Sequence, residues 1–151
     1  MKRIEESIKQ DQFESHHHKA VLNVLYTASC FQLHINKFLK PFGLTHQQFN
    51  VLRILRGQKG QPISLKEVTS RMLDQSSNTS RIIERLRAKQ LIERRECALD
   101  RRAVDLVITQ EGQDLLQQID QAGLIGHLQL ALSHEEAELL NSLLDRMRVN
   151  L

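Results

Sequence analysis

The sequence has few of the residues that interrupt helices or build aromatic clusters. It contains two prolines, six glycines, five phenylalanines, one tyrosine and no tryptophan in 151 residues. Because proline and glycine interrupt helices, their scarcity beside abundant Leu, Ile, Gln, Glu and Arg predicts a mainly helical protein. Hydrophobic residues make up 40% of the chain and charged residues 26%, which excludes a wholly disordered protein and suits one domain with a real core.

Other absences narrow the function. The two cysteines, Cys30 and Cys97, lie far apart and exclude a disulfide framework. No CxxC pair, glycine-rich phosphate loop or HExxH motif occurs, so we expect no metal and no cofactor. No residues assemble a nucleophile, a base and an orienting group, so we do not expect an enzyme. Because no apolar run has the length of a signal peptide or a membrane span, we expect a cytoplasmic protein with no membrane partner.

Apolar residues at steps of three and four predict a long amphipathic helix over residues 18–40, after a frayed helical start in residues 1–15. Pro41 and Gly43 should end this helix, since proline cannot donate into a helix and glycine tolerates the exit geometry. The apolar stripe consists of Val21, Leu25, Ala28, Phe31, Ile35 and Phe38.

Three capping boxes mark further helix starts. In each, a hydroxyl can accept from the amide three residues on, while a Gln or Glu side chain reaches back to the first amide. The boxes are Thr45–Gln48, Ser64–Glu67 and Ser133–Glu136. The helix after Thr45 should end at residues 57–60, and the short helix after Ser64 should end near Leu73.

A helix-turn-helix and a hairpin are predicted in the middle of the chain. A third helix should run from Ser76 to about Lys89, so that two short helices flank a tight polar turn. Residues 91–95 and 103–108 then predict two strands joined by a turn at Asp100. Thr109 should cap a following helix that carries Leu115, Leu116, Ile119, Ala122 and Ile125.

These elements predict a mainly α fold with a small β-hairpin wing. Residues 45–108 would form a winged helix-turn-helix, and residues 18–44 and 109–151 would add flanking dimerisation helices within the single domain 1–151. The flanking helices carry more apolar surface than the small core needs, which favours a homodimer. Two winged helices could then bind two half-sites one duplex turn apart, on the order of 34 Å.

Positive charge is concentrated in the predicted third helix and hairpin. Residues 81–102 carry a net charge of +4 while the whole chain carries +3, so the remainder is about neutral. A local positive field on a helix and a hairpin is typical of a surface that enters one groove of DNA and touches the next. The alternative is a winged helix used as a protein-interaction module, which predicts a neutral or apolar helix surface.

The order of these motifs resembles the MarR family of bacterial winged-helix transcription regulators. The resemblance runs from about residue 18 to the end and is sharpest at Ser77–Leu86, Leu91–Arg95, Asp100–Arg102, and Thr109 with Gly112. It implies a dimer that binds palindromic double-stranded promoter DNA, usually as a repressor. It also implies release by a small aromatic or amphipathic ligand, or by cysteine oxidation. Gln90 stands where the family favours a left-handed glycine, and glutamine there should cost about 1 kcal/mol.

Small polar residues crowd the start of the predicted third helix. Helix capping would explain one or two of them, whereas contacts to base edges and phosphates explain a run of five. The run consists of Ser76, Ser77, Asn78, Thr79 and Ser80. Arg81 and Arg85 follow on the outward face. They could be solvated charges paired with nearby glutamates, but phosphate or guanine contact fits the context better.

In the hairpin, the resemblance assigns DNA contact to the turn. It implies that Asp100 holds Arg102 so that the guanidinium can enter the minor groove, with Arg101 on phosphate. An exposed ion pair of little energetic weight is the alternative. Arg95, on the preceding strand, completes the predicted DNA-binding residues.

An effector site has both a functional and a structural interpretation. Phe38, Phe42 and Phe49 could line a cleft in the region where the resemblance places ligands, or they could simply pack in the core.

Cysteine and histidine also have two interpretations. Cys30 could be a redox-sensing thiol or a buried small hydrophobe. Oxidation of Cys97 at the wing could disturb DNA contact. Three consecutive histidines at 16–18 spread around a helix, so we expect surface residues there and no metal site.

Overall fold

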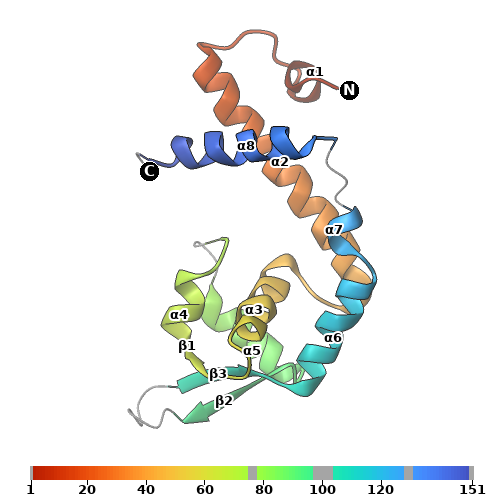
Figure 1. Cartoon of the computed structure of the whole chain (residues 1–151), viewed down its shortest axis with the longest axis vertical. Coiled ribbons are helices and arrows are strands. Elements are labelled where there is room, and N and C mark those ends of the chain that lie inside the picture. Colours follow the sequence, from red (N-terminus) through yellow and green to blue (C-terminus); the bar gives the residue numbers. More distant parts are fainter. Residues whose placement is uncertain (1, 75–77, 97–103, 128–130, 150–151) are drawn as a thin grey trace.

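The computed structural model of the chain describes residues 2–74, 78–96, 104–127 and 131–149. Figure 1 shows a small sheet and short helices at one end of the molecule and the helices α1 and α8 at the other, with the long α2 running between them. In chain order the elements are α1 (Ile4–Ile8), α2 (His16–Leu39), the 3-10 turn η1 (Lys40–Phe42), α3 (His46–Gly57), β1 (Ile63–Ser64), α4 (Leu65–Ser70), α5 (Thr79–Ala88), β2 (Ile92–Glu96), β3 (Val104–Ile108), α6 (Gln110–Gln121), α7 (Leu124–His127) and α8 (His134–Met147).

The predicted winged helix is confirmed, with one strand more than expected. The sheet has the order β1-β3-β2, and both pairings are antiparallel. In the hairpin, Ile92 pairs with Ile108 and Arg94 with Leu106. The strand β1 is only two residues long, with Ile63 opposite Leu106, and two residues are too few for a periodic sequence signal.

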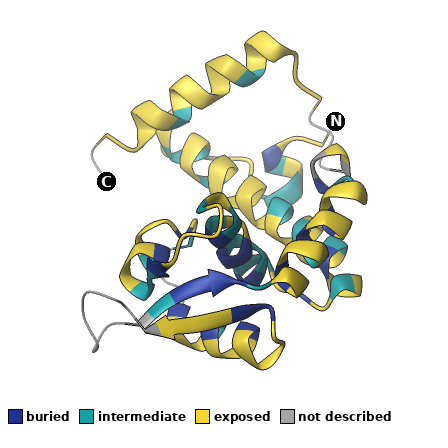
Figure 2. Cartoon of the chain, turned by 60° about the horizontal axis from the view of Figure 1, so that its bottom comes forward, coloured by how far each residue is buried: buried dark blue, intermediate teal, exposed yellow. Residues whose placement is uncertain are grey.

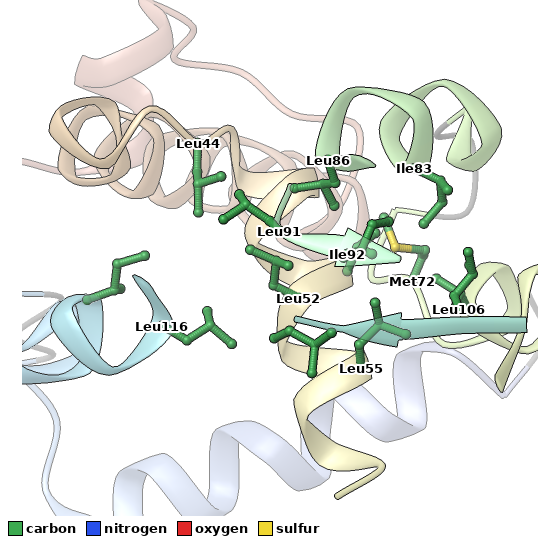
Figure 3. Packing of buried hydrophobic residues seen from close by; sticks show 14 of the residues in the cluster. Leu44, Leu52, Leu55, Met72, Ile83, Leu86, Leu91, Ile92, Leu106 and Leu116 are labelled. Atoms are coloured by element: carbon green, nitrogen blue, oxygen red, sulfur yellow. The ribbon is translucent and has the colours of Figure 1, made fainter. Parts of the chain in front are cut away.

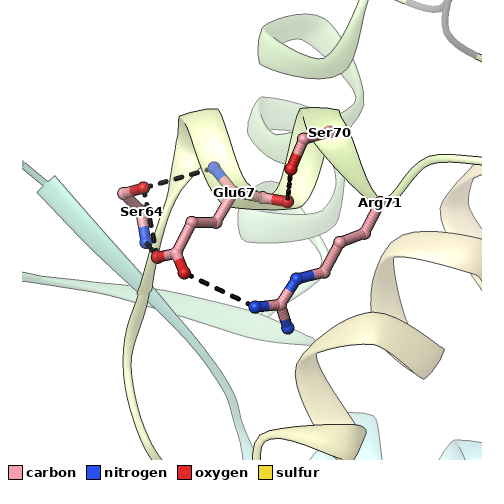
Figure 4. A network of polar contacts seen from close by, with 4 residues as sticks. All are labelled: Ser64, Glu67, Ser70 and Arg71. Atoms are coloured by element: carbon pink, nitrogen blue, oxygen red, sulfur yellow. Dashed lines mark hydrogen bonds and ion pairs between the residues drawn. The ribbon is translucent and has the colours of Figure 1, made fainter.

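All three capping boxes are present as predicted. Figure 4 shows the one that begins α4: Ser64 Oγ accepts from the Glu67 amide at 3.2 Å, and Glu67 Oε2 accepts from the Ser64 amide at 3.2 Å. Arg71 also donates to the Glu67 carboxylate, at 3.4 Å. The α4 helix ends at Ser70, earlier than predicted, because Arg71 already closes the turn onto the carbonyls of Val68 and Thr69.

The long helix α2 begins and ends on local signals. Ser15 Oγ accepts from the His18 amide, so the helix starts at His16, two residues before the prediction. At its other end the chain passes through η1, and Gly43 takes a φ of +68°, the left-handed conformation that glycine reaches without a Cβ clash. The chain then reverses direction into α3.

The core gathers around α3. Leu52 and Leu55 of α3, Leu86 of α5, Leu106 of β3 and Leu116 of α6 are all buried and lie together (Figure 3). Burying one such leucine stabilises a fold by about 1.5–3 kcal/mol. This shared core therefore fixes α5 relative to the sheet and to α6.

The end of α6 differs from the prediction. The helix stops at Gln121, and Gly123 turns the chain with a φ of +75°, so Ile125 belongs to α7 and not to α6. The left-handed glycine breaks a stripe that the apolar periodicity alone continued. Among the residues described, no helix combines the length and the apolar character that crossing a bilayer requires.

Helix α8 hardly takes part in the core. None of its residues is buried, and Figure 2 shows it almost wholly exposed. Its exposed side chains nevertheless include large apolar ones, namely Leu139, Leu140, Leu143 and Met147.

Candidate nucleic-acid interface

Helix α5 presents one apolar and one basic face. Asn78 begins it, since its Oδ1 accepts from the Arg81 amide at 3.1 Å. Ile83 and Leu86 are buried in the core, whereas Arg81 and Arg85, four residues apart, are exposed on the outer side. A helix of this kind, fixed by its apolar face, can offer its outer face to a DNA groove.

The polar run before and in the first turn of α5 divides into three parts. Asn78 and Ser80 are exposed, as predicted for a contact surface. Thr79 is only 5% exposed, so its side chain lies on the inner face and is not available to a base edge. Ser76 and Ser77 lie outside the described residues, and so do Cys97, Asp100, Arg101 and Arg102 of the predicted wing.

The exit from α5 has the backbone geometry that the family resemblance implies. Gln90 has a φ of +60°, although it is not glycine. The Leu91 amide donates to the Leu86 carbonyl at 3.1 Å, and the Gln90 amide donates to the Arg87 carbonyl at 2.8 Å. These two bonds close the helix and direct the chain into β2.

Thr109 and Gly112 lock the start of α6 onto this exit. The Thr109 hydroxyl donates to the Gln90 carbonyl at 2.8 Å, and the Thr109 amide donates to the Leu91 carbonyl at 3.1 Å. The same hydroxyl oxygen accepts from the Gly112 amide at 3.1 Å. A Cβ on Gly112 would lie 2.3 Å from the Leu91 carbonyl oxygen, so only glycine fits. The Thr-x-x-Gly pattern is therefore the physical joint between α5 and α6.

The basic side chains of α5 and β2 fall into two groups. Arg87 and Arg94 both pair with Glu84, Arg95 pairs with Glu93 at 2.6 Å, and the Lys89 ammonium donates to the Gly43 carbonyl. By contrast, within the described part of the chain no ion pair or side-chain hydrogen bond holds Arg81 or Arg85. The pairing of Arg94 with Glu84 joins a strand to a helix ten residues away, so no local sequence pattern could have predicted it.

A polar groove of about 280 Å³ lies beside the unpaired arginines. It runs between α5 and the start of α3, and its lining includes Thr45, Gln47, Asn78, Arg81 and Arg85. Hydroxyl, amide and guanidinium groups are the donors that bind phosphate and base edges in DNA complexes.

An acidic residue, Asp74, also lines this groove and acts on a neighbouring histidine. Burial lowers the pKa of His46 below its usual value, and the charge of Asp74 partly opposes that shift. The neutral imidazole is therefore favoured at the first residue of α3.

A second cavity, of about 380 Å³, lies between α3, α6 and α7. Phe49 and Leu124 give it apolar walls, and Arg53 and Asp120 lie at its edge. Of the three predicted effector residues, only Phe49 lines it. Phe38 and Phe42 pack against each other, with their ring centroids 5.9 Å apart, and against the core.

Two arginines of α3 converge on one carboxylate of α6 at this cavity. Arg53 lies 3.1 Å from Asp120 Oδ1, and Arg56 lies 2.7 Å from Asp120 Oδ2. The Arg53 guanidinium also sits 6.0 Å from the centre of the Phe49 ring. The sequence-based prediction missed this cluster because it joins helices that are distant in the chain.

Cys30 and the possible metal ligands are the remaining residues that the sequence singled out. Cys30 is half-buried within α2 and is a free thiol. In the part of the chain that the structure describes, no three His, Cys, Asp or Glu side chains come together as they would around a metal ion.

Sequence comparison identifies relatives of this chain. A model of the MarR family matches residues 42–103. The HTH-type transcriptional regulator MhqR of Bacillus subtilis is 32% identical over 119 residues, which cover 78% of this chain and 81% of MhqR. The transcriptional repressor MprA of Escherichia coli is 31% identical over 110 residues, which cover 72% of this chain and 62% of MprA.

Solved structures share the fold. A mutant of MarR from E. coli, crystallised with operator DNA, matches with a TM-score of 0.79 and 23% identity over 91% of this chain and 99% of that one. An organohalide-sensing regulator in its 2,4-dichlorophenol-bound form matches with a TM-score of 0.78 and 17% identity over 92% of this chain and 85% of that one.

Proposed function

The chain belongs to the MarR family of transcription regulators, which bind DNA and are not enzymes, and from this premise we propose that it is a homodimeric repressor released from promoter DNA by a small ligand. The observation that carries the proposal is the outer face of α5. There Arg81 and Arg85 stand exposed beside a polar groove on a helix that the core holds rigidly. In this proposal α5 enters the major groove, and the hairpin with Arg101 and Arg102 reaches the adjacent minor groove.

The homodimer is supported by apolar surface that this chain leaves uncovered. Leu25 and Leu33 of α2 are 61% and 69% exposed, and Leu139, Leu140 and Leu143 of α8 are each more than 40% exposed. Large apolar side chains left open to water on two helices are typical of an interaction surface. A second copy would cover it with the same helices, since the commonest oligomers are twofold symmetric dimers.

Release by a ligand is supported by the cavity between α3 and α6. Its apolar walls suit an aromatic ring, and Arg53, which lines the cavity beside Asp120, suits a carboxylate or phenolate. An acidic aromatic ligand would compete with Asp120 for Arg53 and so weaken the ion pair that joins α3 to α6. We favour this route over oxidation of Cys30, because that thiol is half-buried in α2.

Fluorescence anisotropy on the DNA upstream of the protein's own gene tests the proposal. We expect selective binding relative to a scrambled duplex, with dimer stoichiometry and an affinity that falls steeply with salt, because phosphate contacts release counterions. Arg102→Ala should weaken this binding. Equal, weak binding of both duplexes would contradict an autoregulatory repressor, and unchanged affinity of Arg102→Ala would contradict the role given to the wing.

A further inference from the structure

Glu84 holds two of the arginines that border the proposed DNA surface. Its carboxylate lies 3.3 Å from Arg87 Nη2, one turn along α5, and it also pairs with Arg94 of β2. The side chain of Arg87 is 54% exposed and that of Arg94 is 39% exposed. Both guanidinium groups would therefore be accessible to another anion if the carboxylate released them.

Ion pairs as exposed as these contribute little to the stability of a fold. The core that places α5 is apolar, and the joint between α5 and α6 is made by backbone groups with Thr109. Stability is thus a weak reason for the Glu84 carboxylate. Its electrostatic effect on a binding surface matters more, because a phosphate that approaches either arginine meets the adjacent carboxylate and must compete with it for the N–H donors.

We propose that Glu84 is a specificity-determining residue that keeps Arg87 and Arg94 from the phosphates of non-cognate DNA. The inference rests on the proposed function, in which α5 enters the groove. Non-specific binding is almost wholly the electrostatic attraction of cations to phosphates, whereas specific binding adds contacts to base edges. Pairing Arg87 and Arg94 with Glu84 weakens the electrostatic attraction, and it leaves Arg81 and Arg85, which pair with no described residue, to bind phosphates and base edges.

The direct test is the salt dependence of binding to a scrambled duplex. Glu84→Gln should bind it several-fold more tightly than the wild type, with a slope of log affinity against log salt that is steeper by about 1 for each arginine freed. Selectivity for the operator should fall. The control is Glu14→Gln, which makes the same charge change at an exposed position before α2, far from the sheet (Figure 1), and should leave the slope almost unchanged.

A second comparison does not depend on how well Glu84→Gln folds. In the wild-type background, Arg87→Gln should leave the slope on scrambled DNA near its wild-type value, whereas Arg85→Gln should reduce it by about 1. Adding Arg87→Gln to Glu84→Gln extends the first test, and it should remove part of the gain in slope.

Three results would overturn the inference or its premise. If Arg87→Gln and Arg85→Gln reduced the salt slope on scrambled DNA equally in the wild-type background, Glu84 would not keep Arg87 from phosphates. Weaker binding of Glu84→Gln to both duplexes, with an unchanged slope, would make Glu84 a structural tie between α5 and β2. No effect of Arg85→Gln on either duplex would instead reject the placement of α5 in the groove, and the inference with it.

Discussion

At two residues of the joint between α5 and α6, the local geometry disfavours a Cβ. One of them, Gln90, carries a Cβ nonetheless, and the other, Gly112, does not. Gln90 occupies a left-handed conformation that costs a residue with a Cβ about 1 kcal/mol. Gly112 has no room for a Cβ, because the Leu91 carbonyl and the Ile108 side chain lie against it. The two positions therefore respond to substitution in opposite directions.

Replacing Gln90 by glycine should stabilise the protein. At a φ of +60° the substitution relieves the Cβ clash, and the hydrogen bond from the Thr109 hydroxyl to the backbone carbonyl of residue 90 is retained. We expect a gain of up to about 1 kcal/mol in the free energy of unfolding, measured by urea denaturation. Gln58→Gly makes the same change at a φ of −79° and should be destabilising. A loss of stability in Gln90→Gly would contradict the assigned strain.

Replacing Gly112 by alanine should destabilise the protein and loosen α6. The new methyl would lie 2.3 Å from the Leu91 carbonyl oxygen and 2.8 Å from Ile108 Cγ1, so α6 must move away. We expect a loss of about 1–3 kcal/mol, the usual cost of overpacking. Gly57→Ala is the control, because nothing lies within 4 Å of that Cβ and alanine favours the helix. Equal melting temperatures for the two variants would disprove the lock.

At the scale of whole elements, the three helices that open with a capping box begin where the sequence predicts, whereas α2 begins two residues earlier than expected and α5 begins at Thr79 and not near Ser76. The capping boxes of α3, α4 and α8 are all present, because a cap requires only residues three positions apart. The ends of α4 and α6 were predicted too late, since apolar periodicity continues through residues that no longer form a helix. Helix α8 has no buried residue, so the core of a single chain does not account for its apolar side chains.

A charge on the apolar side of α8 should separate the proposed dimer. Leu140→Arg puts a guanidinium at a position that is 42% exposed in one chain and that the partner would cover. An unpaired buried charge is costly, so we expect the dimer to weaken at least tenfold, about 1.4 kcal/mol, in sedimentation equilibrium. Ser142→Arg, on the other side of the helix, is the control. A dimer of unchanged affinity in Leu140→Arg would exclude α8 from the interface.

At the scale of the whole molecule, the fold could be predicted from the sequence more fully than the site. Periodicity, capping boxes and the turn signals identified a mainly helical winged helix, because those signals are local. Which arginines remain unpaired could not be predicted. The partners of Arg94 and Arg53, namely Glu84 and Asp120, come from other elements that only the folded core brings near. The burial of Thr79 could not be predicted either, because it also depends on elements that only the folded core brings near.

We expect a dimer that binds the major groove with two copies of α5, and a hydroxyl-radical footprint on the operator tests this most directly. It should show two protected stretches on one face of the duplex, with centres about one helical turn, roughly 10 base pairs, apart. In the Arg81→Ala, Arg85→Ala double variant both stretches should become accessible together. A single protected stretch, or a footprint unchanged in the double variant, would contradict the placement of α5 in the major groove.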